Sequence, residues 1–215
     1  ITHPDFKNPK VLVAEDKHSV ITDIEVTRDG IFFVRVQNGV IAKLYQYRTG
    51  QAIEIPLPNP SGTVLIHSLG TETSCLSLVT RGWTTKNTRY RYDTKNNTFE
   101  KEELITSYEY QEFKDFIIEE IEIPSHDGVL LPVSLVYKKG LKKDGNNRTL
   151  LYAYGSYGSN VKPFFNTPFL SWVAQGGIMV VPHVRGGGEK GDAWHKAGFK
   201  ITKPNTWKDM IACTQ

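Results

Sequence analysis

The sequence predicts a mixed fold in which an all-β part is followed by an α/β part, and three observations support this prediction. Residues 20–103 contain short runs of alternating apolar and polar residues separated by turn residues. Two later apolar runs, 150–154 and 178–181, each lead into a glycine-rich loop. The segment between these two runs has helix-start and helix-stop residues, which predicts the order strand, loop, helix, strand.

The composition is that of an ordinary globular protein. The chain has 215 residues, of which 39% are hydrophobic and 23% charged, enough for one medium domain or parts of two. Its 26 basic and 23 acidic residues give a net charge of only +3, so a nucleic-acid partner is not expected. Cys75 and Cys213 have no metal-ligand spacing, so we expect free thiols, no metal and no other cofactor. No apolar run is long enough to cross a membrane.

The first part is predicted to be antiparallel β-structure. The dipeptide Asn38-Gly39 between two alternating runs is a hairpin signal. Strands are expected at residues 31–36, 40–47, 52–55, 63–66, 74–79, 88–92 and 98–99.

These strands form two similar sets. The turn residues Tyr47–Thr49 correspond to Tyr92–Thr94 about forty-five residues later, and Ile31 corresponds to Ser74 at about forty-three. A repeat of this length is typical of four-stranded propeller blades, which stack on neighbours to bury their faces. An ordinary β-sandwich with a chance similarity is the alternative. Two blades do not close a propeller, so we expect further blades to precede this segment.

The boundary between the two parts is predicted where turn signals become sparse, between about Leu104 and Gln111. The resulting domains are residues 1–111 and 112–215.

The second part begins with a predicted hairpin. Strands are expected at 116–123 and 129–137, joined by the turn Ser125–Gly128, in which Gly128 allows a positive φ. His126 is expected to be a turn residue rather than a catalytic one.

A βαβ unit follows. The strand at 150–154 leads through a loop to a helix that Asn166 or Thr167 caps, with Pro168 in its first turn and Gly176-Gly177 as its stop. The strand at 178–181 then pairs in parallel with the first, since a helical crossover connects them.

A last helix is predicted to begin near Thr206. Thr206 and Asp209 have capping-box spacing, and the helix runs to Gln215 without a stop signal. The apolar positions on one face of this helix are Trp207, Met210 and Ile211.

So few parallel strands would bury little apolar surface by themselves, so we expect the chain to be part of a longer one.

Gly186–Gly191 matches the dinucleotide pattern G-x-G-x-x-G, and Asp209 follows at about the distance of a ribose-binding acid. That site requires a long helix after the motif, whereas a glycine and a proline interrupt the segment here. We therefore expect the glycines to permit a tight turn and close packing, with Arg185 and Glu189 as a structural ion pair.

The loop Gly155–Gly158 is not a nucleophile elbow, because G-x-S-x-G requires a glycine where this chain has Tyr154. Ser156 is therefore not predicted as a nucleophile. In α/β-hydrolases the loop after an early central strand supplies an oxyanion-hole donor, and a tyrosine hydroxyl can take that role. The alternative is that Tyr152, Tyr154 and Tyr157 only pack, and spacing does not decide between these two.

Other polar residues give weaker signals. His195, in a short helix, is expected to be packed or hydrogen-bonded. His183 lies just beyond a strand end and is a better candidate for lining a site, although no partner is predicted. The pairs Glu119-Glu120 and Glu102-Glu103 are interpreted as solvated charges.

Four motifs in this order resemble the prolyl oligopeptidase family of serine peptidases, which includes oligopeptidase B. They are Ser125–Gly128, Tyr152–Gly158, His183–Glu189 and Trp194–Gly198. The resemblance extends from about residue 116 to the end of the chain. It implies a β-propeller that caps an α/β-hydrolase domain, with this segment as the last two blades and the first part of the hydrolase.

The resemblance also implies a function, the cleavage of short peptides after proline through an acyl-enzyme formed by a Ser-Asp-His triad. In the family the triad lies after the segment that matches Asp209–Cys213, so this chain alone is expected to be inactive. The family's oxyanion-hole tyrosine falls on Tyr154. The aromatic residue that lines the substrate pocket falls on Tyr157, where prolyl oligopeptidase has phenylalanine.

Alternatives remain at this stage. Tyr157, Ser156 and His183-Val184 lean toward oligopeptidase B, which cleaves after Lys or Arg, and a non-catalytic binding module is a further possibility. Short peptides are the implied partners, and no oligomeric state is predicted. A cytoplasmic location is expected, with a periplasmic one left open because the native N-terminus is expected to lie upstream of Ile1.

Overall fold

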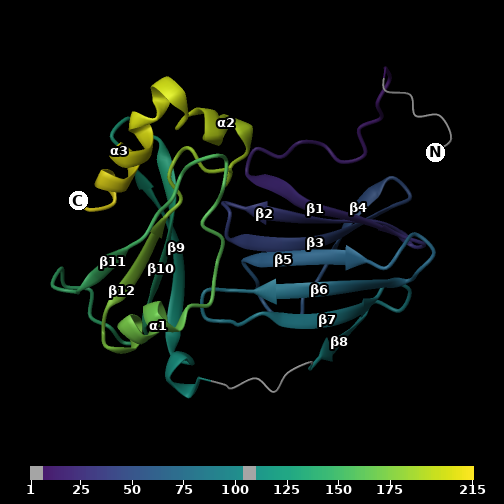
Figure 1. The fold of residues 1–215 in the computed structure, drawn as a ribbon, viewed down its shortest axis with the longest axis horizontal. Coiled ribbons are helices and arrows are strands. Elements are labelled where there is room, and N and C mark those ends of the chain that lie inside the picture. Colours follow the sequence, from purple (N-terminus) through teal and green to yellow (C-terminus); the bar gives the residue numbers. More distant parts are fainter. Residues whose placement is uncertain (1–6, 104–109) are drawn as a thin grey trace.

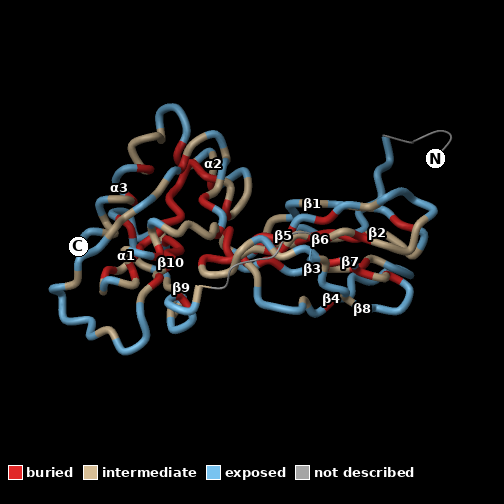
Figure 2. The backbone as a smooth tube through the Cα atoms, turned by 60° about the horizontal axis from the view of Figure 1, so that its bottom comes forward, coloured by how far each residue is buried: buried red, intermediate tan, exposed pale blue. Residues whose placement is uncertain are grey.

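The computed structural model describes residues 7–103 and 110–215, which form two lobes (Figure 1). One lobe contains two four-stranded antiparallel sheets, and the other a four-stranded mixed sheet with helices around it. Buried segments run through the interior of each lobe (Figure 2). The predicted domain boundary falls mainly on residues 104–109, which lie outside the described residues.

Each antiparallel sheet is a meander whose strands follow one another in chain order. Every strand predicted for this part overlaps one of the observed strands, and the first strand is an addition that the turn pattern does not single out. The first sheet consists of β1 (Ser19–Thr27), β2 (Gly30–Gln37), β3 (Ile41–Arg48) and β4 (Gln51–Ile55), and the second of β5 (Thr63–Ser68), β6 (Cys75–Arg81), β7 (Thr88–Asp93) and β8 (Thr98–Glu102).

The hairpin predicted at Asn38-Gly39 is confirmed. Both residues have positive φ, 51° and 78°, and β2 and β3 pair in antiparallel fashion on either side of them. Asparagine and glycine adopt this conformation at little steric cost, which is why the dipeptide specifies the turn.

The two antiparallel sheets share one apolar core. Their strands bury alternate residues, as expected for a side-chain period of two, and Phe32, Leu44, Leu78 and Tyr92 are completely buried between them. Polar contacts also join the sheets, among them the Thr94 hydroxyl, which donates to Asp29 Oδ2 at 2.5 Å. Stacked blades and a sandwich both have such a core.

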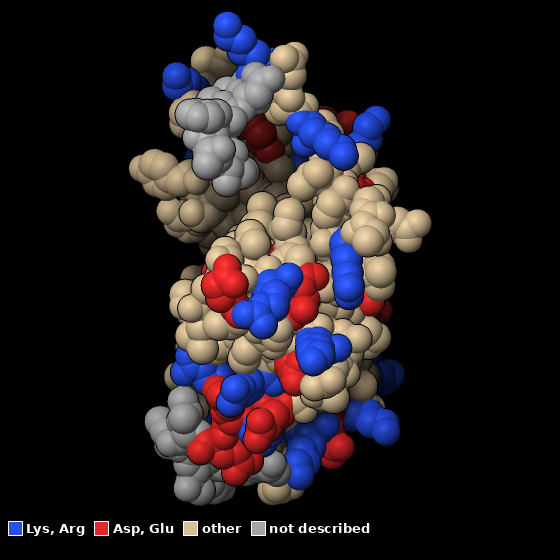
Figure 3. Space-filling model, turned by 90° about the vertical axis from the view of Figure 1, so that its right-hand side faces the viewer, with Lys and Arg blue, Asp and Glu red and all other residues tan. Residues whose placement is uncertain are grey.

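The surface of this lobe carries both signs of charge. On the face shown in Figure 3, Lys and Arg side chains lie next to Asp and Glu. Elsewhere in this lobe, opposite charges also pair across neighbouring strands, for example Lys43 with Glu54 at 2.9 Å. Exposed pairs of this kind add little stability, and they leave no extended surface of one sign on this face.

The mixed sheet has the strand order β11-β12-β10-β9. The predicted hairpin is confirmed, since β9 (Phe116–Pro124) and β10 (Leu130–Lys138) are antiparallel and Gly128 in the turn has a φ of 81°. The predicted βαβ unit is also confirmed, because β11 (Thr149–Leu151) and β12 (Ile178–Pro182) are parallel. β11 ends three residues earlier than predicted.

Helix α1 (Thr167–Ala174) crosses between the two parallel strands as predicted. Asn166 caps it by accepting a hydrogen bond from the amide of Phe169 at 3.1 Å, and Gly176 has a positive φ just after its end. Its buried residues Leu170 and Val173 pack on β10 and β12. The core beneath α1 reaches the first lobe through Trp83 and thereby connects the two lobes.

Further short helical elements belong to this lobe. The 3₁₀ turn η1 (Gln111–Phe113) precedes the mixed sheet, and α2 (Asp192–Lys196), η2 (Lys200–Thr202) and α3 (Pro204–Ala212) follow it. The capping box predicted for Thr206 and Asp209 is wrong, because α3 begins at Pro204 and both side chains are buried in contacts with another segment. The apolar residues Trp207 and Ile211 are exposed instead.

Two further observations concern the whole described chain. Cys75 and Cys213 are free, as predicted. Among residues 7–103 and 110–215, no helix is both long and apolar enough to cross a bilayer.

Candidate functional site

Three backbone segments meet beyond the ends of the parallel strands β11 and β12. The amide of Gly158 donates to the carbonyl of Gly186 at 3.1 Å, and the amide of Gly186 donates to the carbonyl of Trp194 at 3.1 Å. The carboxyl edge of a parallel sheet is where α/β enzymes place their sites, so this junction is the natural candidate.

Glycine is required where these segments touch. Gly155 has a φ of +80°, and a Cβ at this position would lie 2.5 Å from Val184 Cγ2. Gly186 has a φ of +102°, and its Cβ would lie 2.2 Å from the carbonyl oxygen of Gly155. The expectation that the glycines permit close packing is therefore confirmed.

The three tyrosines of the loop have different surroundings. Tyr152 packs edge-on against Phe164 and Phe169. All three are exposed, Tyr152 to 42%, Tyr154 to 49% and Tyr157 to 85%, and in the described part of the chain neither the Tyr154 nor the Tyr157 hydroxyl has a hydrogen-bond partner. Tyr157 also has a φ of 56°, a left-handed conformation that bulky residues adopt at a cost of about 1–3 kcal/mol. The loop therefore presents two aromatic hydroxyls to solvent in a constrained backbone.

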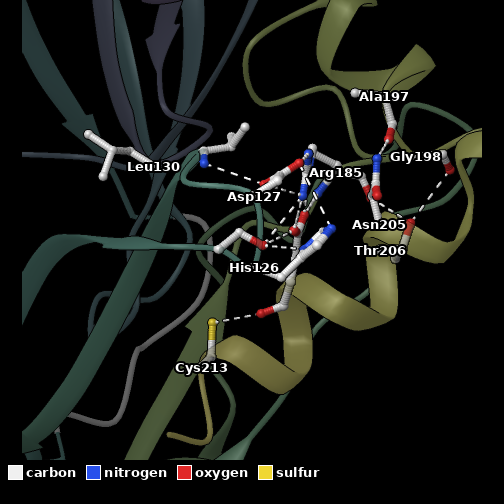
Figure 4. Close-up of polar contacts among 12 residues, drawn as sticks. His126, Asp127, Leu130, Arg185, Ala197, Gly198, Asn205, Thr206 and Cys213 are labelled. Atoms are coloured by element: carbon white, nitrogen blue, oxygen red, sulfur yellow. Dashed lines mark hydrogen bonds and ion pairs between the residues drawn. The ribbon is translucent and has the colours of Figure 1, made fainter.

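A buried charge cluster supports the junction from below (Figure 4). The guanidinium of Arg185 donates to both oxygens of Asp209, at 2.9 Å from Nε and 2.6 Å from Nη2, and to both oxygens of Asp127, at 2.6 and 3.1 Å. Ser125 Oγ donates to Asp209 at 2.6 Å. Arginine holds two carboxylates in this way because its five N–H donors form a planar fork.

The cluster corrects the predicted ion pair between Arg185 and Glu189. The side chain of Arg185 extends toward the β9–β10 turn and α3, whereas the carboxylate of Glu189 faces His183, with Oε1 3.7 Å from Nδ1. The ribose-binding interpretation of Asp209 is excluded as well, because its carboxylate is fully buried against Arg185.

The electrostatic effect of the cluster is direct. The Arg185 guanidinium keeps the pKa of Asp127 below its ordinary value, and hydrogen bonds to Asp209 raise the pKa of Arg185 itself. Asp127 and Arg185 are therefore charged at neutral pH. Removing one member of a buried pair leaves the other charge uncompensated, which typically costs about 3–5 kcal/mol.

A lysine also contacts the tyrosine loop. Lys203, immediately before α3, donates from Nζ to the carbonyl of Gly155 at 2.5 Å and to Ser156 Oγ at 2.7 Å. The sequence contains no signal for this contact, because the partners are 48 and 47 positions apart and no local pattern links them.

The two histidines near the junction have structural contacts. His195 Nδ1 lies 3.0 Å from the carbonyl oxygen of Gly186, so its prediction as a hydrogen-bonded helix residue is confirmed. The interpretation of His183 as a site-lining residue is wrong. Its side chain is buried in the sheet, where Nε2 lies 2.9 Å from Ser134 Oγ.

Both neighbouring glutamates of β9 have partners. Ser134 Oγ donates to Glu120 Oε2 at 2.6 Å, and desolvation raises the pKa of Glu120, so this carboxyl differs from the solvated charge predicted for it. Glu119 accepts from Lys143 at 2.5 Å and from Tyr137 at 2.8 Å.

A cavity of about 450 Å³ opens between the two lobes. Its walls include Ile55, Trp83, Ile118 and Glu120. No residue of the tyrosine loop lines it, so this cavity is separate from the candidate site.

The fold and the site define a class of protein: an α/β enzyme domain with a tyrosine-bearing loop at its strand ends, joined to a lobe of antiparallel sheets. The pattern described as "Prolyl oligopeptidase family" (Peptidase_S9) matches residues 163–215. The prolyl endopeptidase of Elizabethkingia meningoseptica is 31% identical over 217 aligned positions, which cover 99% of this chain and 30% of that protein.

Solved structures agree with the sequence comparison. Prolyl oligopeptidase B from Galerina marginata, bound to a 35-residue hydrolysis and macrocyclization substrate, superposes with a TM-score of 0.82 and 26% identity over 96% of this chain and 29% of its own. Oligopeptidase B from Trypanosoma brucei superposes with a TM-score of 0.74 and 28% identity over 94% of this chain and 30% of its own.

The chain belongs to the prolyl oligopeptidase family. It spans about three tenths of the length of the relatives with which it was compared.

Proposed function

We propose that the whole protein is a serine endo-oligopeptidase that cleaves short peptides after proline, and that this chain supplies its oxyanion-hole tyrosine, Tyr154. The observation that carries the proposal is the half-exposed Tyr154 on a constrained loop beyond the parallel strands. Similarity to a prolyl endopeptidase along almost the entire chain supports the proline specificity.

The proposal assigns a role to each part of the chain. Residues 1–111 form the last blades of a β-propeller, which the two successive four-stranded meanders support. Residues 112–215 form the first part of an α/β-hydrolase domain, supported by a hairpin that precedes a parallel βαβ unit. The serine, aspartate and histidine of the triad belong to the remainder of the protein, so the chain alone is inactive.

The mechanism is acyl transfer. As the triad serine attacks the scissile carbonyl, negative charge develops on the carbonyl oxygen, and the Tyr154 hydroxyl donates a hydrogen bond to it. Because the loop is packed before substrate arrives, the donor needs no reorganisation at the moment of reaction. Tyr157, the more exposed aromatic residue, lines the pocket for the residue before the scissile bond. This chemistry needs no cofactor.

Replacing Tyr154 with phenylalanine in the whole protein tests the proposal. Loss of one oxyanion-hole donor typically lowers kcat by about 10² to 10³, and we expect KM to change little because the bond forms in the transition state. Tyr152→Phe is a matched control, since it removes a hydroxyl from the same loop at a ring that packs edge-on against Phe164 and Phe169. Unchanged kcat in Tyr154→Phe would reject the oxyanion role.

A second candidate is cleavage after Lys or Arg, which the structural similarity to Trypanosoma brucei oligopeptidase B favours. Matched peptides that carry Pro or Arg before the scissile bond separate the two specificities. We expect faster cleavage of the proline peptide. A protein that cleaves neither peptide would be a binding module instead.

A further inference from the structure

The contact between Lys203 and the tyrosine loop has a function beyond stability. We infer that Lys203 is a positioning residue, whose ammonium group clamps the backbone next to Tyr154 and thereby fixes the place of the oxyanion donor. The two acceptors of the ammonium, the Gly155 carbonyl at 2.5 Å and Ser156 Oγ at 2.7 Å, are the residues that directly follow Tyr154.

A second contact holds the same piece of backbone. Gly155 lies against Val184 and Thr206 so closely that a methyl group would not fit. The Thr206 hydroxyl donates to the Arg185 carbonyl at 2.7 Å, which fixes this wall to the buried charge cluster. The backbone after Tyr154 is therefore held both by a packed wall and by an ammonium group.

Lys203 itself is held in place by the preceding turn. Thr202 Oγ1 donates to the carbonyls of Lys196 at 2.6 Å and Phe199 at 2.7 Å, which ties η2 to the end of α2. Lys203 then directly precedes Pro204, the first residue of α3. The ammonium thus projects from a junction of three short helices rather than from a free loop.

No carboxylate in residues 7–103 and 110–215 forms an ion pair with Lys203, and burial lowers the pKa of its ammonium group. A half-buried cation without a counter-ion is unfavourable for folding alone. Its two hydrogen bonds both go to the loop that carries Tyr154, so holding this loop is the use that the geometry indicates.

A positioning role predicts a particular kinetic result. A displacement of about 1 Å in a catalytic group can lower the rate about a hundredfold. We therefore expect Lys203→Met in the whole enzyme to lower kcat about ten- to one-hundredfold, with KM changed less than about twofold. Lys203→Arg, which keeps charge and donors, is expected to recover most of the loss. Lys208→Met, the same charge loss at an exposed site on α3, is the control and is expected to leave kcat unchanged.

The inference rests on the proposed role of Tyr154, so a double variant is included. If Lys203 acts through Tyr154, adding Lys203→Met to Tyr154→Phe causes no further loss of kcat. Hydrogen exchange adds a readout that does not depend on activity. The amides of Gly158 and Ser159 are hydrogen-bonded to the carbonyls of Gly186 and Ser156. We expect the hydrogens of these two amides to exchange faster in the Lys203→Met variant than in the Lys208→Met variant.

The outcomes separate the two ideas. Unchanged kcat with unchanged exchange in Lys203→Met, or independent losses that multiply in the double variant, would overturn the positioning role. Unchanged kcat in Tyr154→Phe would instead reject the oxyanion role, and faster loop exchange in Lys203→Met would then still support the clamp. If Lys203→Met does not fold, Ser156→Ala removes only the second acceptor, and a several-fold loss of kcat is the supporting result.

Discussion

Replacing Asp209 with asparagine removes the charge from the buried half of the Arg185 cluster and leaves its other half in place. Asp209 is completely buried and accepts hydrogen bonds from the Arg185 backbone amide, from Nε and Nη2 of its guanidinium, and from Ser125 Oγ. Asparagine has nearly the same shape but carries a donor where two of these bonds need an acceptor. The buried guanidinium therefore loses the charged partner that has no contact with solvent.

The size of the effect follows from burial. Breaking a buried charge pair costs about 3–5 kcal/mol. We expect the loss in Asp209→Asn to lie near the lower end of this range, because Asp127 still compensates part of the Arg185 charge. Asp127→Asn is the matched comparison, because it makes the same chemical change in the other carboxylate that accepts hydrogen bonds from Arg185. The side chain of Asp127 is 36% exposed, and exposed pairs contribute about 1 kcal/mol or less.

Urea unfolding followed by tryptophan fluorescence measures both variants on one scale. We expect the free energy of unfolding to fall by about 3 kcal/mol in Asp209→Asn and by about 1 kcal/mol or less in Asp127→Asn. A loss in Asp127→Asn that equals or exceeds the loss in Asp209→Asn would refute the reasoning that burial decides the energy of each pair.

Two further predictions concern pH and glycine. Arg185 lowers the pKa of Asp127 in the folded state, so the stability from this carboxylate is complete above the unfolded pKa of about 4 and is lost as pH falls through the lower folded pKa. Unfolding titrations at several acidic pH values should therefore show a larger loss of stability in the wild type than in Asp127→Asn, which keeps the other carboxylates with lowered pKa values, such as Asp93 and Glu119. Gly155→Ala should destabilise the protein by about 2 kcal/mol more than Gly140→Ala, as measured by urea unfolding. Both glycines have a φ near +80°, but only at Gly155 does the added methyl group meet other atoms, Val184 Cγ2 among them. Equal losses in the two variants would mean that backbone strain alone accounts for the effect.

Local patterns predicted the secondary structure of this chain well, and the reason is that the determining residues are neighbours in sequence. The Asn38-Gly39 hairpin and the Asn166 cap are both specified by residues no more than three positions apart, so a short stretch of sequence is enough to predict them. The parallel pairing of β11 with β12 followed from the helix between them, since a crossover of that kind has one common geometry.

The same reasoning failed where a side chain had two chemically sensible partners. Thr206 and Asp209 have the spacing of a capping box, and Arg185 lies four residues from Glu189, so local pairs were expected in both cases. The structure instead pairs Arg185 with Asp209, 24 residues away, because α3 offers the guanidinium a completely buried carboxylate beyond the end of β12. Spacing identifies which groups are able to pair, but burial selects the pair that forms.

Three of the residues that sequence reasoning misassigned or missed contact the same short piece of backbone. Thr206 packs on Gly155, the Arg185 carbonyl lies beside it, and Lys203 donates to its carbonyl. A turn with positive φ at Gly155 and Tyr157 is not a low-energy conformation for a free loop, so contacts from several elements must hold it. A merely structural turn would not require a half-buried, uncompensated ammonium group among those contacts. The cost of that charge is better explained if the orientation of Tyr154, rather than the stability of the turn, is what the three contacts preserve.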